Sequence, residues 1–216
     1  MFGDLDYDPQ LTYAACPLED QLEALTAAVR AGKVRHVGLS NETPWGLMRF
    51  CQLACSDPAA PRVATLQNTY SLLCRTFDAG LAECCHVEGV GLLAYSPLAM
   101  GLLSGKYLAP DGGPPGARLN RYRGRYAEAE SRYGPKPNVR EAVAAYVDLA
   151  RQWGLSPVVV ALRFVLSHPL VVSAVTGATS LAQLDELLEA AAQPALEPDL
   201  RAAIDAVHQH FPNPCP

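Results

Sequence analysis

Residues 62–95 contain one strand–helix–strand unit: Arg62-Val-Ala-Thr-Leu-Gln67, a helical segment over 77–87, and Val90-Gly-Leu-Leu-Ala-Tyr95. The two outer segments are short and apolar, which is typical of buried strands. Two strands joined through a helix run parallel, and the helix packs on the sheet. This unit therefore predicts an α/β fold.

The same alternation continues toward the N-terminus. A strand is predicted at Lys33–Ser40, between a helix that Gly32 closes in a left-handed cap and a helix over 44–55 that Pro44 opens. The preceding helix is indicated by apolar residues at helical spacing from Leu18 to Val29.

Toward the C-terminus, the chain predicts helices from 139 to about 154, 157–166, 181–192 and 198–210, with a strand at Val171–Val175. Residues 107–137 break the pattern with glycine and proline, which indicates a long loop, either functional or disordered. Four parallel strands suit a doubly wound sheet or a (β/α) barrel, although a complete barrel takes about 250 residues. No GxGxxG follows the first strand, which weakens the doubly wound dinucleotide-binding alternative.

Composition narrows the class of protein. The chain has 216 residues, which fits one domain or most of a larger one, and its net charge of −5 argues against a general nucleic-acid binder. No apolar run approaches the roughly 20 residues that span a membrane. The first residues form neither a secretory signal nor a transit peptide. We therefore predict a cytoplasmic protein without a nucleic-acid or membrane partner, or a plastid protein if a transit segment lies upstream.

The chain has seven cysteines and no CxxC pair. This spacing favours buried free thiols in a reducing compartment over a metal site, and no metal ligand is predicted. The cysteines are Cys16, Cys51, Cys55, Cys74, Cys84, Cys85 and Cys215.

Polar side chains follow each predicted strand, and the carboxyl ends of parallel strands usually form the ligand site. The amides of Asn41 and Gln67 suit a planar carboxamide, and the ring of Tyr95 suits a flat ring. The turn at 177–180 leads into a helix N-terminus, which favours a phosphate. The alternative is helix capping, by Ser40 or Asn41 before 44–55 and by Ser180 with Gln183 before 181–192.

At these strand ends the sequence resembles the aldo-keto reductase superfamily, within its Tas-like and potassium-channel β-subunit-like branch. The resemblance runs from about residue 2 to the C-terminus. It rests on Gly38-Leu-Ser-Asn-Glu-Thr43, Gln67-Asn-Thr-Tyr-Ser-Leu-Leu73, Leu93-Ala-Tyr-Ser-Pro-Leu-Ala-Met-Gly-Leu-Leu-Ser-Gly-Lys-Tyr107 and Gly177-Ala-Thr-Ser-Leu-Ala-Gln183.

The resemblance implies a (β/α)8 TIM barrel that binds NADP(H) and reduces carbonyl substrates by hydride transfer. The chain resembles the C-terminal half, strands five to eight with their helices, so residues 1–216 are expected to form one aldo-keto reductase-like domain without the N-terminal half. Such a partial barrel leaves open sheet edges, which predicts self-association.

The resemblance also assigns the cofactor residues. Ser40, Asn41 and Gln67 are expected to hold the nicotinamide carboxamide, and Tyr95 to stack on its ring. Leu187 departs from the family's asparagine, which reads adenine. The remaining expected contacts are to the pyrophosphate and adjoining phosphates, from Ser96, Pro97, Leu98, Met100 and Lys106, and to the 2′-phosphate and adenine, from Gly177, Thr179, Gln183 and Glu186.

The family's catalytic aspartate, tyrosine, lysine and histidine have no matching segments here, so no catalytic residue is predicted. Two functions follow: an NADP(H)-dependent reductase that is weak or inactive alone, or a non-catalytic protein that binds the cofactor or a partner.

The segment Arg118-Leu-Asn-Arg-Tyr-Arg-Gly-Arg-Tyr126 admits an RNA-binding interpretation, with arginines on phosphates and tyrosines on bases. The acidic chain favours a solvated loop over the cofactor, in which some of these arginines meet its phosphates.

Overall fold

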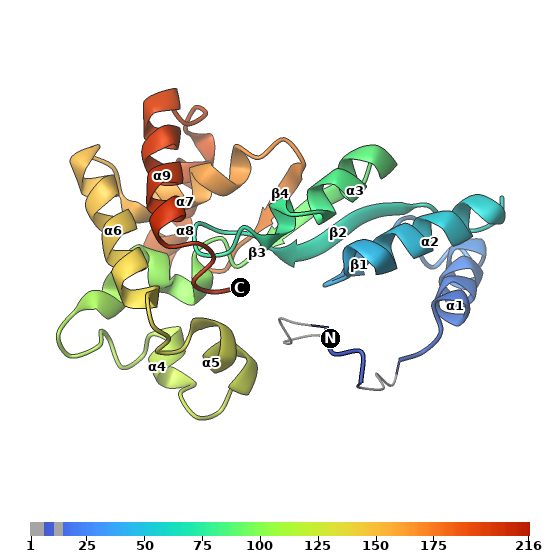
Figure 1. The fold of residues 1–216 in the computed structure, drawn as a ribbon, viewed down its shortest axis with the longest axis horizontal. Coiled ribbons are helices and arrows are strands. Elements are labelled where there is room, and N and C mark those ends of the chain that lie inside the picture. The colour runs from blue at the N-terminus through green and yellow to red at the C-terminus, as the bar shows by residue number, and fades with distance from the viewer. Residues whose placement is uncertain (1–6, 11–14) are drawn as a thin grey trace. The chain divides into compact units, whose positions relative to one another are not determined.

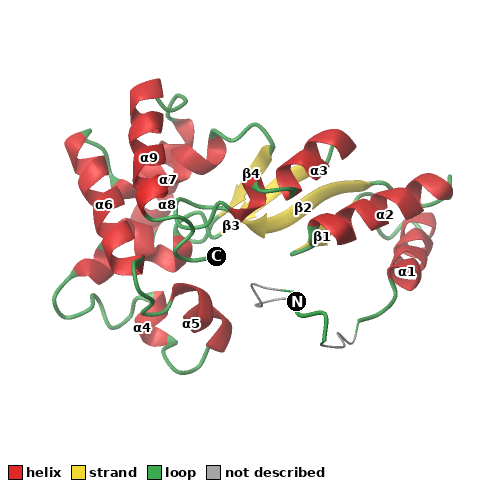
Figure 2. Ribbon diagram, viewed as in Figure 1, coloured by secondary structure: helices red, strands yellow, loops and turns green. Residues whose placement is uncertain are grey.

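A computed structural model describes residues 7–10 and 15–216. The chain is an α/β protein with four parallel strands in the order β1-β2-β3-β4 (Figure 2). It divides into two compact units. Unit 1 consists of Met1–Asn68 and Phe77–Leu93, and unit 2 of Thr69–Thr76 and Ala94–Pro216.

Unit 1 alternates helices and strands along the chain (Figure 1). Strands β1 and β2 are parallel, with Val37 opposite Val63 and Ser40 opposite Gln67, and the register shifts after Val37. Strand β3 begins in unit 1 and ends in unit 2. The elements are α1 (Leu18–Arg30), β1 (Val37–Ser40), α2 (Pro44–Ser56), β2 (Val63–Thr69), α3 (Leu81–Glu88) and β3 (Gly91–Tyr95).

Most of these elements confirm the sequence-based prediction. Gly32 has a φ of 68° just after α1, and Pro44 lies in the first turn of α2. Strand β1 is shorter than predicted, because its pairing with β2 begins only at Val37. The predicted helix over 77–87 was also wrong at its start. Gly80, with a φ of 115°, separates α3 from a 3-10 turn at Thr76–Asp78.

Unit 2 is built around α7, in which seven of ten residues are buried. Helix α7 packs against α8 and β4, and its Val158 and Leu162 form a core cluster with Leu187 and Ala190 of α8. The elements are the 3-10 helices η2 (Ala99–Ser104) and η3 (Lys106–Leu108), then α4 (Arg118–Arg121), α5 (Ala127–Tyr133), α6 (Val139–Gln152), α7 (Pro157–Leu166), β4 (Val171–Val175), α8 (Leu181–Ala192) and α9 (Pro198–His210).

The C-terminal tail is fastened within unit 2 by Arg75, whose side chain is only 7% exposed. The Arg75 backbone N–H donates to Asn213 Oδ1 at 2.6 Å, and its Nη1 donates to Asp205 Oδ1 at 2.6 Å. The guanidinium carbon lies 4.4 Å from the centre of the Phe164 ring. The Cys215 N–H also donates to the Leu73 carbonyl, so the tail is bonded to the backbone near Arg75 at two points.

Strand β4 and helix α8 leave apolar side chains exposed. Strands of a parallel sheet are normally covered on both faces, yet Val172 is 63% exposed in the described part of the chain. Leu181, Leu184 and Leu188 recur at helical spacing on α8 and are also exposed. The exposed apolar face of each element, Val172 on β4 and the three leucines on α8, is of a kind that isolated soluble domains usually keep small.

Four of the seven cysteines are buried, as predicted: Cys51, Cys74, Cys85 and Cys215. The prediction was wrong for Cys16 and Cys55, which are exposed. Cys55 follows Cys51 by one helical turn of α2, so the end of the helix turns it toward solvent.

Within residues 7–10 and 15–216, no single helix is both long and apolar enough to cross a membrane. The pair α6 and α7 meets the criteria of length and composition only when taken together across a 98° bend.

Candidate cofactor site

In unit 1 the structure brings together the three residues predicted to hold the carboxamide. Strand β1 ends at Ser40, which pairs with Gln67 of β2, whereas β2 continues to Thr69, two residues beyond the predicted end at Gln67. The Asn41 N–H donates to the Gln67 carbonyl at 2.9 Å, and Asn41 Nδ2 donates to Ser40 Oγ at 3.0 Å. Asn41 has a φ of 54°, a left-handed conformation that asparagine tolerates better than most residues. The side chains of Ser40 and Asn41 are therefore bonded to each other, and the backbone of Gln67 is bonded to Asn41.

Helix capping does not account for Ser40 and Asn41. The cap of α2 is Thr43, whose Oγ1 accepts a hydrogen bond from the Gly46 N–H at 3.1 Å. That alternative interpretation was therefore wrong at this strand end, whereas at α8 it is confirmed. There Ser180 Oγ accepts from the Gln183 N–H at 3.3 Å.

In unit 2 the chain after β3 contains four left-handed residues, one of them Ser96 and three consecutive. Ser96, Ala99, Met100 and Gly101 have φ values of 54°, 47°, 57° and 89°. Leu98 precedes Ala99 with a φ of −101°, and a step between right-handed and left-handed backbone forms a concavity that favours anions. Two short hydrogen bonds close the run, from the Ala99 N–H to the Ser96 carbonyl at 2.8 Å and from the Gly101 N–H to the Leu98 carbonyl at 2.9 Å.

Lys106 adds a positive charge to this run. A Cβ at Gly101 would lie 2.9 Å from Lys106 Cε and 3.0 Å from Nζ, so the ammonium group lies directly over the glycine. Gly101 has a positive φ as well, and both features call for glycine here. The predicted phosphate residues Ser96, Pro97, Leu98, Met100 and Lys106 thus belong to one continuous turn.

The residues predicted to bind the 2′-phosphate lie at the start of α8. Gln183 Oε1 accepts from the Thr179 N–H at 2.9 Å and from Thr179 Oγ1 at 3.1 Å. Gly177, Thr179 and Gln183 are exposed. Exposed donors at a helix N-terminus are suited to an anion, but the Gln183 amide already satisfies two of them.

Glu186 and Leu187 have structural roles in unit 2. Glu186 Oε1 accepts from Ser156 Oγ at 2.6 Å, and Ser156 also caps α7 by accepting from the Val158 N–H. Leu187 is buried in the α7–α8 core cluster. The position where the resemblance expects an asparagine that reads adenine is therefore a packing position in this chain.

Comparison with known proteins gives the family. The family model described as "Aldo/keto reductase family" matches residues 6–209. The chain belongs to the aldo/keto reductase family. Members of this family are oxidoreductases that typically use NAD(P)H.

Several curated proteins are similar to this aldo/keto reductase chain. "Protein tas" of Escherichia coli strain K12 is 45% identical over 215 residues, which is 100% of this chain and 60% of that protein. An "Aldo-keto reductase" of Babesia bovis is 41% identical, over 84% of this chain and 63% of its own length. Human "Aflatoxin B1 aldehyde reductase member 4" is 31% identical, over 94% of this chain and 63% of its own length. The chain thus spans about three fifths of these relatives.

Two residues near this site were missed by the sequence analysis. Arg132 Nη1 donates to Tyr95 Oη at 2.9 Å. Tyr133 is buried, and burial raises the pKa of its hydroxyl more than interactions with Ser96 and Thr69 lower it. Both residues lie at the end of α5, inside a segment whose periodicity gave no sign of a helix.

The segment predicted as a long loop is held by side chains that bind backbone carbonyls. Asn120 Nδ2 lies 3.0–3.1 Å from the carbonyl oxygens of Gly112, Gly113 and Pro114. Arg140 donates to the carbonyls of Tyr107 at 3.2 Å and of Leu108 at 2.7 Å. The long loop is therefore largely ordered by local hydrogen bonds.

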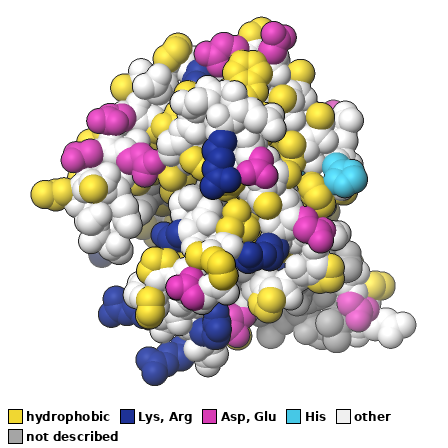
Figure 3. Space-filling model, turned by 90° about the vertical axis from the view of Figure 1, so that its left-hand side faces the viewer, with side chains coloured by type: hydrophobic (Ala, Val, Ile, Leu, Met, Phe, Trp, Pro, Cys, Tyr) yellow, Lys and Arg dark blue, Asp and Glu magenta, His cyan; other side chains and the backbone are white. Residues whose placement is uncertain are grey.

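The arginines of this segment are exposed, which fits the prediction of a solvated surface. Figure 3 shows basic side chains on the lower part of this face of the molecule, with acidic side chains among them. The exposed arginines are Arg118, Arg121, Arg123 and Arg125.

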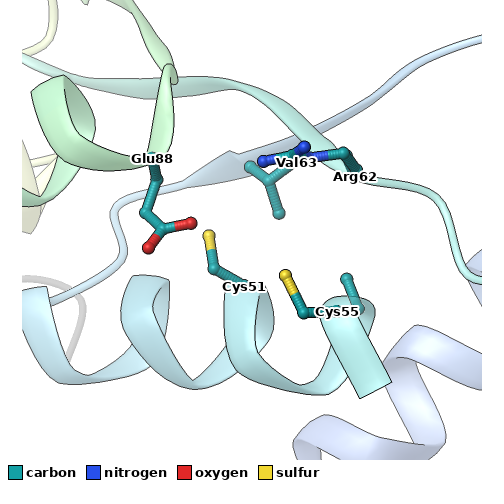
Figure 4. A pocket seen from close by; sticks show the side chains of 6 residues that line it. Cys51, Cys55, Arg62, Val63 and Glu88 are labelled. Carbon is teal, nitrogen blue, oxygen red and sulfur yellow. The ribbon is translucent and has the colours of Figure 1, made fainter. Parts of the chain in front are cut away.

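Two cavities in the described chain are lined by none of the residues predicted to bind the cofactor. The cavity at Cys51, Cys55, Arg62 and Glu88 has a volume of about 10 Å³, room for about one water molecule (Figure 4). Burial raises the pKa of Cys51 to about 11, which opposes a nucleophilic thiolate there. A second cavity, of about 230 Å³, is lined by Arg163, whose guanidinium is already bonded to the carbonyls of the chain at 194–195. Among the described residues, no group of three histidine, cysteine or acidic side chains is arranged to hold a metal ion.

Proposed function

We propose that this chain is the cofactor-binding part of an NADP(H)-dependent aldo-keto reductase, equivalent to strands five to eight of the family barrel. The observation that carries the proposal is the group of Ser40, Asn41 and Gln67, formed where the end of β1 lies beside Gln67 of β2. Amide and hydroxyl side chains offer both donors and acceptors, as a carboxamide requires.

The remaining assignments follow the family resemblance, and local geometry supports those of Tyr95 and of the turn that follows it. Tyr95 is assigned to the nicotinamide ring, because it ends β3 with a half-buried aromatic side chain. The left-handed run after Ser96, together with Lys106, is assigned to the pyrophosphate. The α8 N-terminus, with Thr179 and Gln183, is assigned to the 2′-phosphate.

The chemistry proposed is reduction of a carbonyl group, in which bound NADPH supplies the hydride. The names of two similar proteins, an aflatoxin B1 aldehyde reductase and an L-glyceraldehyde 3-phosphate reductase, favour aldehydes as the substrate class. None of the residues assigned here donates a proton to the carbonyl oxygen, and general acid catalysis typically contributes about 10²–10⁴-fold. We therefore expect the chain alone to turn over 4-nitrobenzaldehyde slowly or not at all.

Titration with NADPH tests the proposal. Wild-type chain is expected to bind NADPH more tightly than NADH, and Gln67→Leu is expected to weaken binding about tenfold, as loss of one well-made hydrogen bond would. Gln52→Leu is the matched control, because Gln52 is exposed on α2 in the same unit. Failure of the wild type to bind NADPH, or equal affinity of the two variants, would contradict the proposal.

Self-association is a separate prediction, based on the apolar face of β4 and α8. Sedimentation velocity at micromolar concentration measures it, and a stable monomer would contradict the expectation that such a face recruits a second copy.

A further inference from the structure

Resting on the proposed function, we propose that the end of α5 is a positioning element for the cofactor site. In this proposal Arg132 fixes the ring of Tyr95, and Tyr133 fixes the turn at Ser96. The two consecutive residues of α5 thus act on Tyr95, which ends β3, and on Ser96, which follows it, each 37 positions earlier in the chain.

Tyr95 is held both at its backbone and at its ring hydroxyl. Its backbone carbonyl accepts a hydrogen bond from the Tyr70 N–H at 3.3 Å, and its hydroxyl accepts one from Arg132 Nη1 at 2.9 Å. A tyrosine side chain has only two rotatable bonds before the ring. Fixing the hydroxyl therefore fixes the ring plane before any ligand arrives, and such preorganisation lowers the cost of stacking a second flat ring on it.

Tyr133 acts on the backbone that follows. Ser96 has a φ of 54°, a conformation that a non-glycine residue keeps only when its surroundings enforce it. Tyr133 is 6% exposed, and interactions of its hydroxyl with the side chains of Ser96 and Thr69 act to lower its pKa, against the larger effect of burial. A buried hydroxyl in this place can hold the Ser96 turn from inside unit 2, where the proposed pyrophosphate contacts begin.

Gly134 sets the geometry of both residues, because it ends α5. Its N–H donates to the Glu130 carbonyl at 2.9 Å, and a Cβ at this position would lie 2.3 Å from the same oxygen. No side chain fits at this distance without moving the backbone. The helix end that carries Arg132 and Tyr133 is thus fixed by one close approach.

The experiment compares Arg132→Met with Arg151→Met, an exposed arginine on α6. The first readout needs no cofactor: NMR spectra of chain carrying ¹³C-labelled tyrosine rings, with the Tyr95 signals assigned by Tyr95→Phe. The second readout is the Kd for NADPH. Arg132→Met is expected to shift and broaden the Tyr95 ring signals and to raise the Kd about tenfold, Arg132→Lys to restore part of both, and Arg151→Met to leave both unchanged.

Two other outcomes distinguish a failure of the positioning role from a failure of the proposed function. Unchanged Tyr95 signals in Arg132→Met would overturn the positioning role, even if the affinity falls, because Arg132 would then contact the cofactor directly. Absence of NADPH binding in the wild type would refute the proposed function, while the NMR comparison would still decide whether Arg132 orders Tyr95.

The role proposed for Tyr133 is tested with two further pairs, each a variant and its matched control. Tyr133→Phe removes only the hydroxyl and is expected to raise the NADPH Kd, whereas Tyr122→Phe, at an exposed tyrosine, is expected to leave it unchanged. Gly134→Ala is expected to disturb the Tyr95 signals, whereas Gly116→Ala, where a Cβ meets nothing within 4 Å, is not. Equal NADPH Kd values in the first pair, or equal Tyr95 signals in the second pair, would overturn the role proposed for Tyr133.

Discussion

Replacing Asp205 by asparagine should destabilise unit 2 in a pH-dependent way. Asp205 Oδ1 accepts a 2.6 Å hydrogen bond from Arg75, and Oδ2 lies 3.3 Å from Arg201 Nε. Asparagine keeps the shape of the side chain and removes its charge. The buried guanidinium of Arg75 then loses its charged partner.

The magnitude lies between two known limits. Exposed ion pairs contribute about 0–1 kcal/mol, and removing one partner of a fully buried pair costs about 3–5 kcal/mol. The Arg75 side chain is 7% exposed and the Asp205 side chain 41%, so the pair is buried on one side only. We expect a loss of about 2 kcal/mol, equal to about 4–8 °C in Tm for a chain of this size.

The pH dependence follows from the pKa of Asp205. Partial burial acts to raise this pKa, but the hydrogen bond from Arg75 and the charge of Arg201 outweigh it and lower the pKa below its usual value. A carboxyl whose pKa falls on folding stabilises the protein above its unfolded pKa, about 3.9, and this contribution is lost as the pH falls through the folded value. The difference between wild type and Asp205→Asn should therefore be full at pH 7 and shrink below about pH 4.

The assay is urea unfolding followed by Trp153 fluorescence in a Trp45→Phe background, because Trp153 then reports on unit 2 alone. The matched control is Asp148→Asn, in the exposed pair with Arg151, which should change stability by less than about 0.5 kcal/mol. Equal losses from the two substitutions at pH 7, or an undiminished Asp205→Asn effect at pH 3, would refute this reasoning.

Three further predictions concern unit 1. Gly38→Ala should destabilise it by about 1–3 kcal/mol in thermal unfolding, because the new Cβ would meet Thr65 Oγ1 at 2.3 Å; an unchanged Tm would contradict this. Thr43→Ala should cost about 1 kcal/mol through loss of the α2 cap, and Thr43→Ser should recover most of it; equal stability of the two variants would count against the cap. Alkylation at pH 8, followed by peptide mass spectrometry, should label the exposed Cys55 well before the buried Cys51. The pKa of Cys51 is about 11, which leaves about one thousandth of this thiol as thiolate at pH 8. Simultaneous labelling of the two cysteines would show that Cys51 is not buried.

The sequence predicted those parts of the fold that local chemistry determines. Pro44 and Pro157 mark helix starts, Gly32 a helix end and Ser180 a cap, because each acts on residues within one turn. The alternation of strands and helices followed from apolar periodicity in the same way. The predicted boundaries were wrong where contacts with a distant segment determine them. The start of β1 is one example, because it depends on where β1 begins to pair with β2.

The candidate site was predictable only in part, for the same reason. Ser40, Asn41 and Gln67 come together because β1 and β2 are parallel neighbours with Ser40 opposite Gln67; the pattern predicted neighbouring parallel strands, although β2 continues to Thr69. Helix α5 and its bond from Arg132 to Tyr95 depend on contacts 37 residues apart in a glycine- and proline-rich segment without apolar periodicity. The burial of Leu187 likewise depends on its packing against Val158 and Leu162 of α7, which are distant in sequence from the motif at 177–183.

The contacts of the Asn120 side-chain amide with three backbone carbonyl oxygens have a consequence for chemical ageing. Hydrolysis of that one amide to a carboxylate would turn an attractive nitrogen into a negative oxygen facing Gly112, Gly113 and Pro114. Deamidation at a single residue would thus open the turn before α4 without cutting the chain, and stored preparations would lose order there first.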